Sequence, residues 1–225
     1  MKYFSRITVP FTGPGAAGLI ETILTDKYKE HQLLWELFPG SPDATRDFLF
    51  RQEIRPDRLI YYVLSGRLPQ AERPGWIVET KSYSPNLRSG QRFLFSIRVN
   101  PVVKRRDDNN HQVRHDVVMD TKWKLRHDDK TIPDRQIIQE SGRAWLERRS
   151  VDGGFILDGS RFRADAYVKH VARKGQPANK LVEYSTLDMR GLLTITDPTP
   201  FLSTLHSGIG PSKAFGCGLL LIKPV

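Results

Sequence analysis

The stretch DFLFRQEIRPDRLIYYVLSG, residues 47–66, has the composition of two β-strands joined by a short turn. Phe, Leu, Ile, Tyr and Val are concentrated in the runs 47–53 and 58–66, and such side chains suit a pleated, partly buried surface. Arginine, proline and aspartate at 55–57 separate the runs, and proline and aspartate are frequent in turns. We therefore predict two neighbouring strands that form a pair.

Outward from this pair, the first part of the chain combines strand and helix patterns. Residues 2–11 alternate apolar and polar side chains, and 76–83 resemble them, so both are predicted strands. Residues 20–38 have helical spacing that ends at proline and glycine. The order is close to the ferredoxin-like one with a weak second helix, and we assign it to a domain spanning 1–88. One face of the helix would carry Leu24, Tyr28, His31, Trp35 and Phe38.

After turn-forming residues at 85–90, a similar order restarts. Residues 93–99 predict a strand, 104–130 a polar and charge-rich loop, and 134–148 a helix that Asp134 could cap. We predict an α+β fold of two tandem ferredoxin-like (RRM-like) βαββαβ domains, the second one enlarged and spanning 91–225. The remaining predicted elements are strands at 153–159, 161–173, 181–187, 191–196 and 218–222 and a helix at 198–207.

The charge is unevenly distributed along the chain. The formal net charge is +10; residues 1–90 hold 12 Lys and Arg against 10 Asp and Glu, whereas 91–225 hold 23 against 15. A basic half indicates a polyanionic partner, nucleic acid first and an anionic membrane surface second. A solvated surface that happens to be basic is the alternative.

The rest of the composition indicates a protein of the cytoplasm. A single cysteine, Cys217, excludes an internal disulfide and suits a reducing compartment. No run approaches the roughly 18 apolar residues of a membrane span, and the N-terminus has no signal-peptide pattern. We therefore expect no membrane association.

The strand predicted at 161–173 would have one mostly apolar face and one cationic face, because successive side chains point to opposite sides. Rows of Arg and Lys on a strand can follow a phosphate backbone. A solvent-facing edge strand guarded by charges is the alternative. The cations of this face are Arg161, Arg163, Lys169 and Arg173, and Lys174 follows in the turn.

The segment 208–218, GIGPSKAFGCG, is the second candidate site. Glycine allows a close approach of the backbone to a ligand, and free N–H groups can bind phosphate oxygens. The segment lacks the Gly-Lys-Ser/Thr ending of a P-loop, and an ordinary glycine-rich turn is the alternative. Lys213 could add a point charge, and the other candidates are Gly208, Gly210, Ser212, Gly216 and Gly218.

The third candidate is the pair Tyr28 and His31, which are three residues apart and thus neighbours on a helix. A histidine can give or take a proton at neutral pH, and RNA supplies its own nucleophile in the 2′-OH. A satisfied core histidine is the alternative, because this helix face is apolar. We predict no metal site: His111 and His115 stand four apart beside Asp116, but no cysteine accompanies them.

Four stretches together resemble the CasE family of CRISPR-associated endoribonucleases, within the RAMP superfamily. They are YKEHQLLWELFP (28–39), PDATRDFLF (42–50), FLFSIRVNP (93–101) and GIGPSKAFGCGLL (208–220). They run from near the start of the chain to its end, and the last one is similar to the glycine-rich loop of the superfamily. The combination is specific, although each stretch alone would not be.

The resemblance implies a metal-independent endoribonuclease without a cofactor. Such an enzyme cleaves CRISPR precursor RNA at the base of the repeat stem-loop by 2′-OH attack, which leaves a 2′,3′-cyclic phosphate. It then stays bound to the hairpin beside the other Cascade subunits; we expect a monomer when it is free. Catalysis would fall to His31 with Tyr28, and we add Lys213 as a stabiliser of the phosphorane.

The resemblance also implies that basic residues of the second domain hold the stem, and Lys104, Arg105 and Arg106 join the candidates above. Two rival functions remain open. One is a non-catalytic RAMP-type RNA-binding subunit, which would not need Tyr28 and His31. The other is a binder of double-stranded RNA or DNA outside CRISPR.

Overall fold

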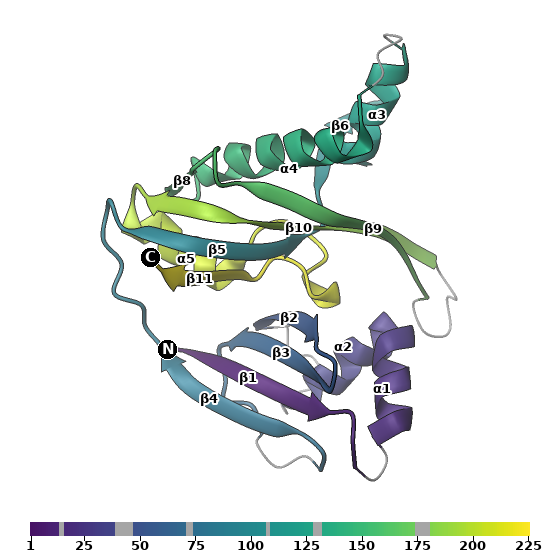
Figure 1. Ribbon diagram of the computed structural model, residues 1–225, viewed down its shortest axis with the longest axis vertical. Helices are drawn as coiled ribbons and strands as arrows, with labels where there is room; N and C mark the ends of the chain where they lie inside the picture. The colour runs from purple at the N-terminus through teal and green to yellow at the C-terminus, as the bar shows by residue number, and fades with distance from the viewer. Residues whose placement is uncertain (14–15, 39–46, 71–73, 107–108, 128–131, 174–180) are drawn as a thin grey trace. The chain divides into compact units, whose positions relative to one another are not determined.

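The computed structural model describes residues 1–13, 16–38, 47–70, 74–106, 109–127, 132–173 and 181–225 (Figure 1). The chain forms two compact units. Unit 1 groups residues 1–86 with 171–183 and 213–219, and unit 2 groups 87–170 with 184–212 and 220–225. Each unit contains antiparallel strand pairs and helices, which confirms the predicted α+β class.

Unit 1 has a four-stranded sheet in the order β2-β3-β1-β4. The predicted pair at 47–66 is confirmed, because β2 and β3 pair antiparallel from Phe48 opposite Ser65 to Ile54 opposite Leu59. The central strand β1 pairs with both β3 and β4. The bounds are β1 Lys2–Pro10, β2 Phe48–Ile54, β3 Arg58–Ser65 and β4 Ile77–Tyr83.

The helix predicted at 20–38 is two helices, α1 (Ala16–Thr25) and α2 (Lys27–Trp35). Asp26 separates them: its backbone is extended, at φ −126° and ψ 98°, and its carboxylate accepts hydrogen bonds from the N–H groups of Tyr28 and Lys29. Aspartate begins a helix in this way because its short side chain competes for backbone donors. The prediction of one continuous helix is therefore wrong. Residues of both helices and of the sheet pack into one aromatic-rich core, which includes Ile23, Leu34, Phe38, Phe48, Phe50, Tyr61 and Trp76.

Unit 2 has a sheet in the order β11-β5-β10-β8, with β9 also paired to β10. The strands predicted at 181–187 and 191–196 are one strand, β10 (Leu181–Ile195). Gly191 does not interrupt it; a Cβ there would lie 2.9 Å from the carbonyl oxygen of Arg161, so the glycine permits a close backbone approach. The other bounds are β5 Arg92–Val99, β8 Phe155–Leu157, β9 Arg163–Arg173 and β11 Leu220–Pro224.

Two predicted helices are present in unit 2, α4 (Asp134–Ser150) and α5 (Pro198–Ser207). Asp134 does not cap α4: the capping position is Pro133, which has no side-chain hydrogen bond, and Asp134 lies in the first turn. α4 buries Trp145 against the sheet, and α5 buries Phe201. No helix within the described residues is long and apolar enough to cross a membrane.

The segment predicted to be a loop at 104–130 instead contains a hairpin and a helix. Strands β6 (Val102–Arg106) and β7 (Gln112–Asp116) pair antiparallel, and α3 (Val117–His127) follows directly. Most of the hairpin is exposed, so it lacks the buried face on which strand prediction depends. We call the described residues 102–106 and 109–127 the arm; Figure 1 shows α3 extending beyond the sheet of unit 2.

Candidate functional site

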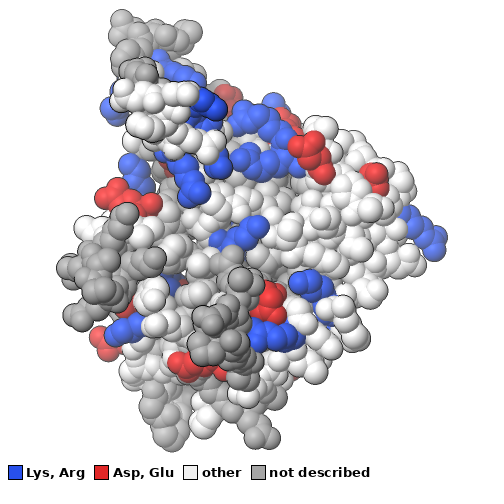
Figure 2. Space-filling model, turned by 180° about the vertical axis from the view of Figure 1, so that it is seen from behind, with Lys and Arg blue, Asp and Glu red and all other residues white. Residues whose placement is uncertain are grey.

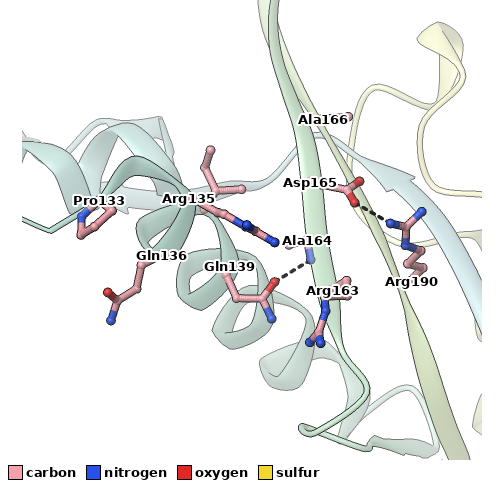
Figure 3. Close-up of a pocket in the computed structure, with 10 residues that line it drawn as sticks. Pro133, Arg135, Gln136, Gln139, Arg163, Ala164, Asp165, Ala166 and Arg190 are labelled. Carbon is pink, nitrogen blue, oxygen red and sulfur yellow. Dashed lines mark hydrogen bonds and ion pairs between the residues drawn. The ribbon is translucent and has the colours of Figure 1, made fainter.

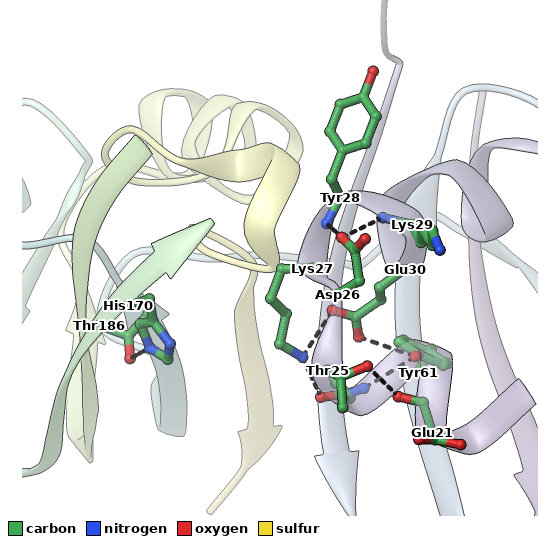
Figure 4. Close-up of polar contacts among 11 residues, drawn as sticks. Glu21, Thr25, Asp26, Lys27, Tyr28, Lys29, Glu30, Tyr61, His170 and Thr186 are labelled. Atoms are coloured by element: carbon green, nitrogen blue, oxygen red, sulfur yellow. Dashed lines mark hydrogen bonds and ion pairs between the residues drawn. The ribbon is translucent and has the colours of Figure 1, made fainter. Parts of the chain in front are cut away.

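Tyr28 and His31 both lie on α2, within unit 1, and both are half-buried. The His31 ring packs on two aromatic rings of the core edge, with its centroid 5.9 Å from that of Trp35 and 6.0 Å from that of Phe48. His31 therefore packs against apolar rings, as a core histidine would, but it also remains partly accessible to solvent. Figure 4 shows the Tyr28 ring pointing away from the polar contacts on the other side of α2.

Those polar contacts form a network that attaches α2 to the sheet of unit 1. Glu30 is only 2% exposed; one carboxylate oxygen accepts from the Lys27 ammonium at 2.9 Å and the other from the Tyr61 hydroxyl at 3.0 Å. Gln52 closes the ring, because its carbonyl accepts from Lys27 at 3.1 Å and its amide donates to Tyr61 at 3.0 Å (Figure 4). Burial, and then the Glu30 carboxylate, raise the pKa of Tyr61, so its hydroxyl stays a donor.

This network was not predicted from the sequence. Lys27 and Glu30 have the i, i+3 spacing of an ion pair, but the same spacing is common on solvated helix faces. The partners are distant in sequence, 25 residues between Lys27 and Gln52 and 31 between Glu30 and Tyr61, so helical spacing cannot identify them. The network fixes the rotation of α2 about its axis, and thereby the direction in which Tyr28 and His31 project.

The glycine-rich segment is divided between the two units. Lys213 to Phe215 form a single 3-10 turn that belongs to unit 1 and lies against α2 and β2. Gly216 follows with φ 76°, a conformation that favours glycine, and a Cβ there would make a tight contact of 3.2 Å with the Phe50 ring. The structure therefore brings the Lys213 turn to the helix that carries Tyr28 and His31.

The first part of the segment has structural roles in unit 2. The N–H of Gly208 donates to the carbonyl of Thr204 and ends α5. Gly210 has φ 81° and leaves room for the Trp145 ring, from which a Cβ would be 3.0 Å away. The Ser212 hydroxyl accepts from the Asn100 amide at 2.7 Å. At the other end of the segment, Gly218 belongs to unit 1, has φ 93° and leads into β11. These positions shape the chain path, and their RNA contacts stay a prediction.

The alternation predicted for 161–173 holds only at its beginning. Arg161 lies in a turn before β9 and, like Arg163, is exposed, whereas Phe162 and Ala164 are buried. Ala166 then has φ 51°, and beyond it the exposed and buried positions no longer alternate as predicted. A residue with this conformation shifts a strand's side chains by one position.

Strict alternation would place Tyr167 on the same exposed face as Arg161 and Arg163, but it does not lie there. It is half-buried, and burial together with the Asp116 carboxylate raises the pKa of its hydroxyl. Lys169 is exposed. The side chain of Arg173 and all of Lys174 lie outside the described residues. The prediction of one continuous cationic face along 161–173 is therefore wrong beyond Asp165.

An open groove of about 860 Å3 in unit 2 contains one of the predicted cations and two that were missed. Arg163 lines it together with Arg135 of α4 and Arg190 of β10 (Figure 3). Gln139 joins the walls, because its amide donates to the Phe162 carbonyl and its oxygen accepts from the N–H of Ala164. Arg190 pairs with Asp165 at 3.0 Å, an exposed and hence weak pair. Three cations thus share an accessible concave surface.

The predicted cations Lys104, Arg105 and Arg106 are exposed on β6. Arg105 forms a bidentate pair with Asp120 at 2.5 and 2.7 Å, and so joins the hairpin to α3. Although burial alone would raise the pKa of Asp120, the hydrogen bonds from Arg105 and Lys124 hold it below its usual value. Arg105 therefore has a structural task in addition to any contact with a ligand.

Asp116, which stands beside His115 in the sequence, also has a structural role. One of its oxygens accepts from the N–H groups of Val118 and Met119 and begins α3. Its other oxygen accepts from the Ser185 hydroxyl on β10. Among the described residues, His, Cys, Asp and Glu nowhere gather in a group of three that could hold a metal ion.

The whole chain is similar to CRISPR-associated proteins. A family model described as "CRISPR associated protein" matches residues 2–224. The CRISPR system Cascade subunit CasE of Escherichia coli K12 is 30% identical over 206 residues, which cover 89% of this chain and 93% of that protein. The CRISPR-associated endoribonuclease Cse3 of Thermus thermophilus is 30% identical over 200 residues, which cover 86% and 80%.

Two solved structures share the fold. Thermus thermophilus Cse3, bound to an RNA representing a pre-cleavage complex, has a TM-score of 0.72 at 23% identity, with 100% of both chains covered. The CRISPR-associated protein Cas6e of Escherichia coli K-12 has a TM-score of 0.61 at 24% identity, with 99% of this chain and 100% of that chain covered.

Proposed function

The chain belongs to the CRISPR-associated protein family, and we propose that it is the endoribonuclease that cuts CRISPR precursor RNA at the base of each repeat stem-loop. The relative Cse3 is an endoribonuclease by name, and CasE is a Cascade subunit by name. The observation that carries the proposal is the grouping within unit 1: Tyr28 and His31 share one helix, and the Lys213 turn lies against it.

These groups suffice for cleavage by the 2′-OH of the RNA without a metal ion. One group removes the 2′-OH proton, the oxygen attacks the adjacent phosphorus, and the bond to the 5′ oxygen breaks as that oxygen is protonated. The products are a 2′,3′-cyclic phosphate and a 5′-OH. We assign His31 as general acid or base, Tyr28 as its assistant, and Lys213 as the cation that stabilises the phosphorane.

The groove lined by Arg135, Arg163 and Arg190 is our candidate for holding the paired stem. Cations in a concave surface favour phosphates, and A-form RNA is recognised mainly by shape and backbone. We further propose that the protein acts in the cytoplasm, as a monomer when free, and that it keeps the cut hairpin within Cascade.

Cleavage of repeat RNA in EDTA tests the proposal, with an RNA that carries a single 2′-deoxyribose before the scissile phosphate as the matched substrate. We expect cleavage of the first RNA and equally tight binding but no cleavage of the second. Loss of cleavage in EDTA would contradict the metal-free chemistry. Tight binding of both RNAs without cleavage would favour the non-catalytic RNA-binding subunit.

A further inference from the structure

Two large apolar side chains are exposed on one side of α3. Met119 is 40% exposed and Trp123, one helical turn later, is 60% exposed. Because both side chains lie on one face of α3, they form an accessible apolar surface that a ligand could contact. The proposed groove lies elsewhere, and neither residue lines it.

The surroundings of Trp123 are strongly basic. Residues 102–127 hold seven Lys and Arg against four Asp. Lys122 and Lys124 flank the tryptophan in sequence, and Arg126 follows within the same helix. Figure 2 shows Lys and Arg side chains gathered around the end of unit 2 that carries α3. Protein interfaces are depleted of lysine in their cores, whereas an aromatic ring among cations is typical of sites for single-stranded nucleic acid.

Contacts within the arm hold the helix α3, which carries Trp123, in place. Asp116 begins α3 and accepts from Ser185 on β10, and Asp120 pairs with both Arg105 of the hairpin and Lys124 of α3. These contacts join the arm to the sheet and the hairpin to the helix. A ring on a positioned helix loses little conformational entropy when it binds a ligand.

The arm packs against α4, the helix that forms one wall of the groove. Lys122, next to Trp123, pairs at 2.5 Å with Asp134 of α4. The two residues beside Asp134, Pro133 and Arg135, line the groove. α3 therefore lies beside the groove, where nucleotides that adjoin a bound stem would leave it.

We propose that Trp123, with Met119 beside it, is a stacking site for an unpaired base of the RNA whose stem occupies the groove. The inference rests on the proposed function and deepens it, because it assigns a contact to unpaired nucleotides in addition to the grip on the stem. Stacking uses the face of the base, so the site accepts any base. The positive charges beside it, on Lys122, Lys124 and Arg126, attract the neighbouring phosphates.

The test compares Trp123→Ala with the wild type on two RNAs, the repeat hairpin with its unpaired nucleotides and a blunt duplex of the stem alone. We expect binding of the hairpin to weaken about tenfold, with an unchanged slope of log Kd against log salt, because no charge is removed. Binding of the blunt duplex should not change. Trp123→Phe should retain most of the affinity, since it keeps an aromatic face.

Ile156→Ala is the matched control, because Ile156 is also an exposed apolar residue of unit 2, at 53%, but lies on β8. It should bind both RNAs as the wild type does, and circular dichroism confirms that each variant is folded. Unchanged hairpin binding by Trp123→Ala, or an equal loss on the blunt duplex, would overturn the stacking site. Failure of the wild type to bind or cut repeat RNA would instead overturn the proposed function.

Discussion

At the scale of single residues, His31 is expected to serve the chemical step and not the binding of RNA. We expect His31→Ala to slow single-turnover cleavage on the order of 10²–10⁴-fold, because a positioned general acid or base contributes about that factor. The Kd for repeat RNA should stay within about twofold of the wild-type value, because we assign RNA binding to the groove and not to His31. Gln32→Ala, exposed on the same helix, is the control. A wild-type rate for His31→Ala would remove His31 from the mechanism.

Glu30 is expected to stabilise the fold through the network behind the catalytic face. Glu30→Ala removes the acceptor of the buried Tyr61 hydroxyl and one of the two acceptors of the Lys27 ammonium, and should lower the free energy of unfolding by about 3 kcal/mol. Urea unfolding measures this. The exposed pair of Arg6 and Glu79 is the control, and Glu79→Ala should cost under about 1 kcal/mol. Equal losses in the two variants would contradict the role of burial.

At the scale of elements, the break between α1 and α2 depends on Asp26. Asp26→Ala removes the acceptor for the N–H groups of Tyr28 and Lys29, and should cost about 1 kcal/mol of stability in urea unfolding. Without this cap the first turn of α2, which carries Tyr28, is held less firmly. We therefore also expect slower cleavage at unchanged RNA affinity. Asp26→Asn retains a capping oxygen and should restore most of both properties. Equal effects of the alanine and asparagine variants would argue against capping as the cause.

At the scale of the whole molecule, the groove should contribute the salt dependence of RNA binding. We expect Arg190→Gln to weaken binding and to reduce the slope of log K against log salt by about one, as for one lost phosphate contact. Arg6→Gln is a close control, since Arg6 is also a partly exposed arginine on a strand and paired with a carboxylate. An unchanged slope for Arg190→Gln would exclude this arginine from the grip.

Much of the secondary structure follows from local pattern alone. The strands of unit 1 and the pair at 47–66 are predictable because period-two alternation and turn residues act over a few positions. Tyr28 and His31 are likewise predictable as neighbours from helical spacing. Local patterns gave wrong predictions where a residue contacts a segment distant in sequence. Gly191 was predicted to separate two strands, but it lies within β10 and accommodates the Arg161 backbone. The shift at Ala166 is invisible to an alternation rule.

Composition and local pattern were enough to predict the fold class, the helical setting of Tyr28 and His31, and the basic character of the second half. The contact between the Lys213 turn and that helix, and the groove that Arg135 and Arg190 share with Arg163, are evident only in the folded chain. Spacing along the chain reports which side chains share one face of one element, whereas the meeting of distant segments depends on how whole elements pack.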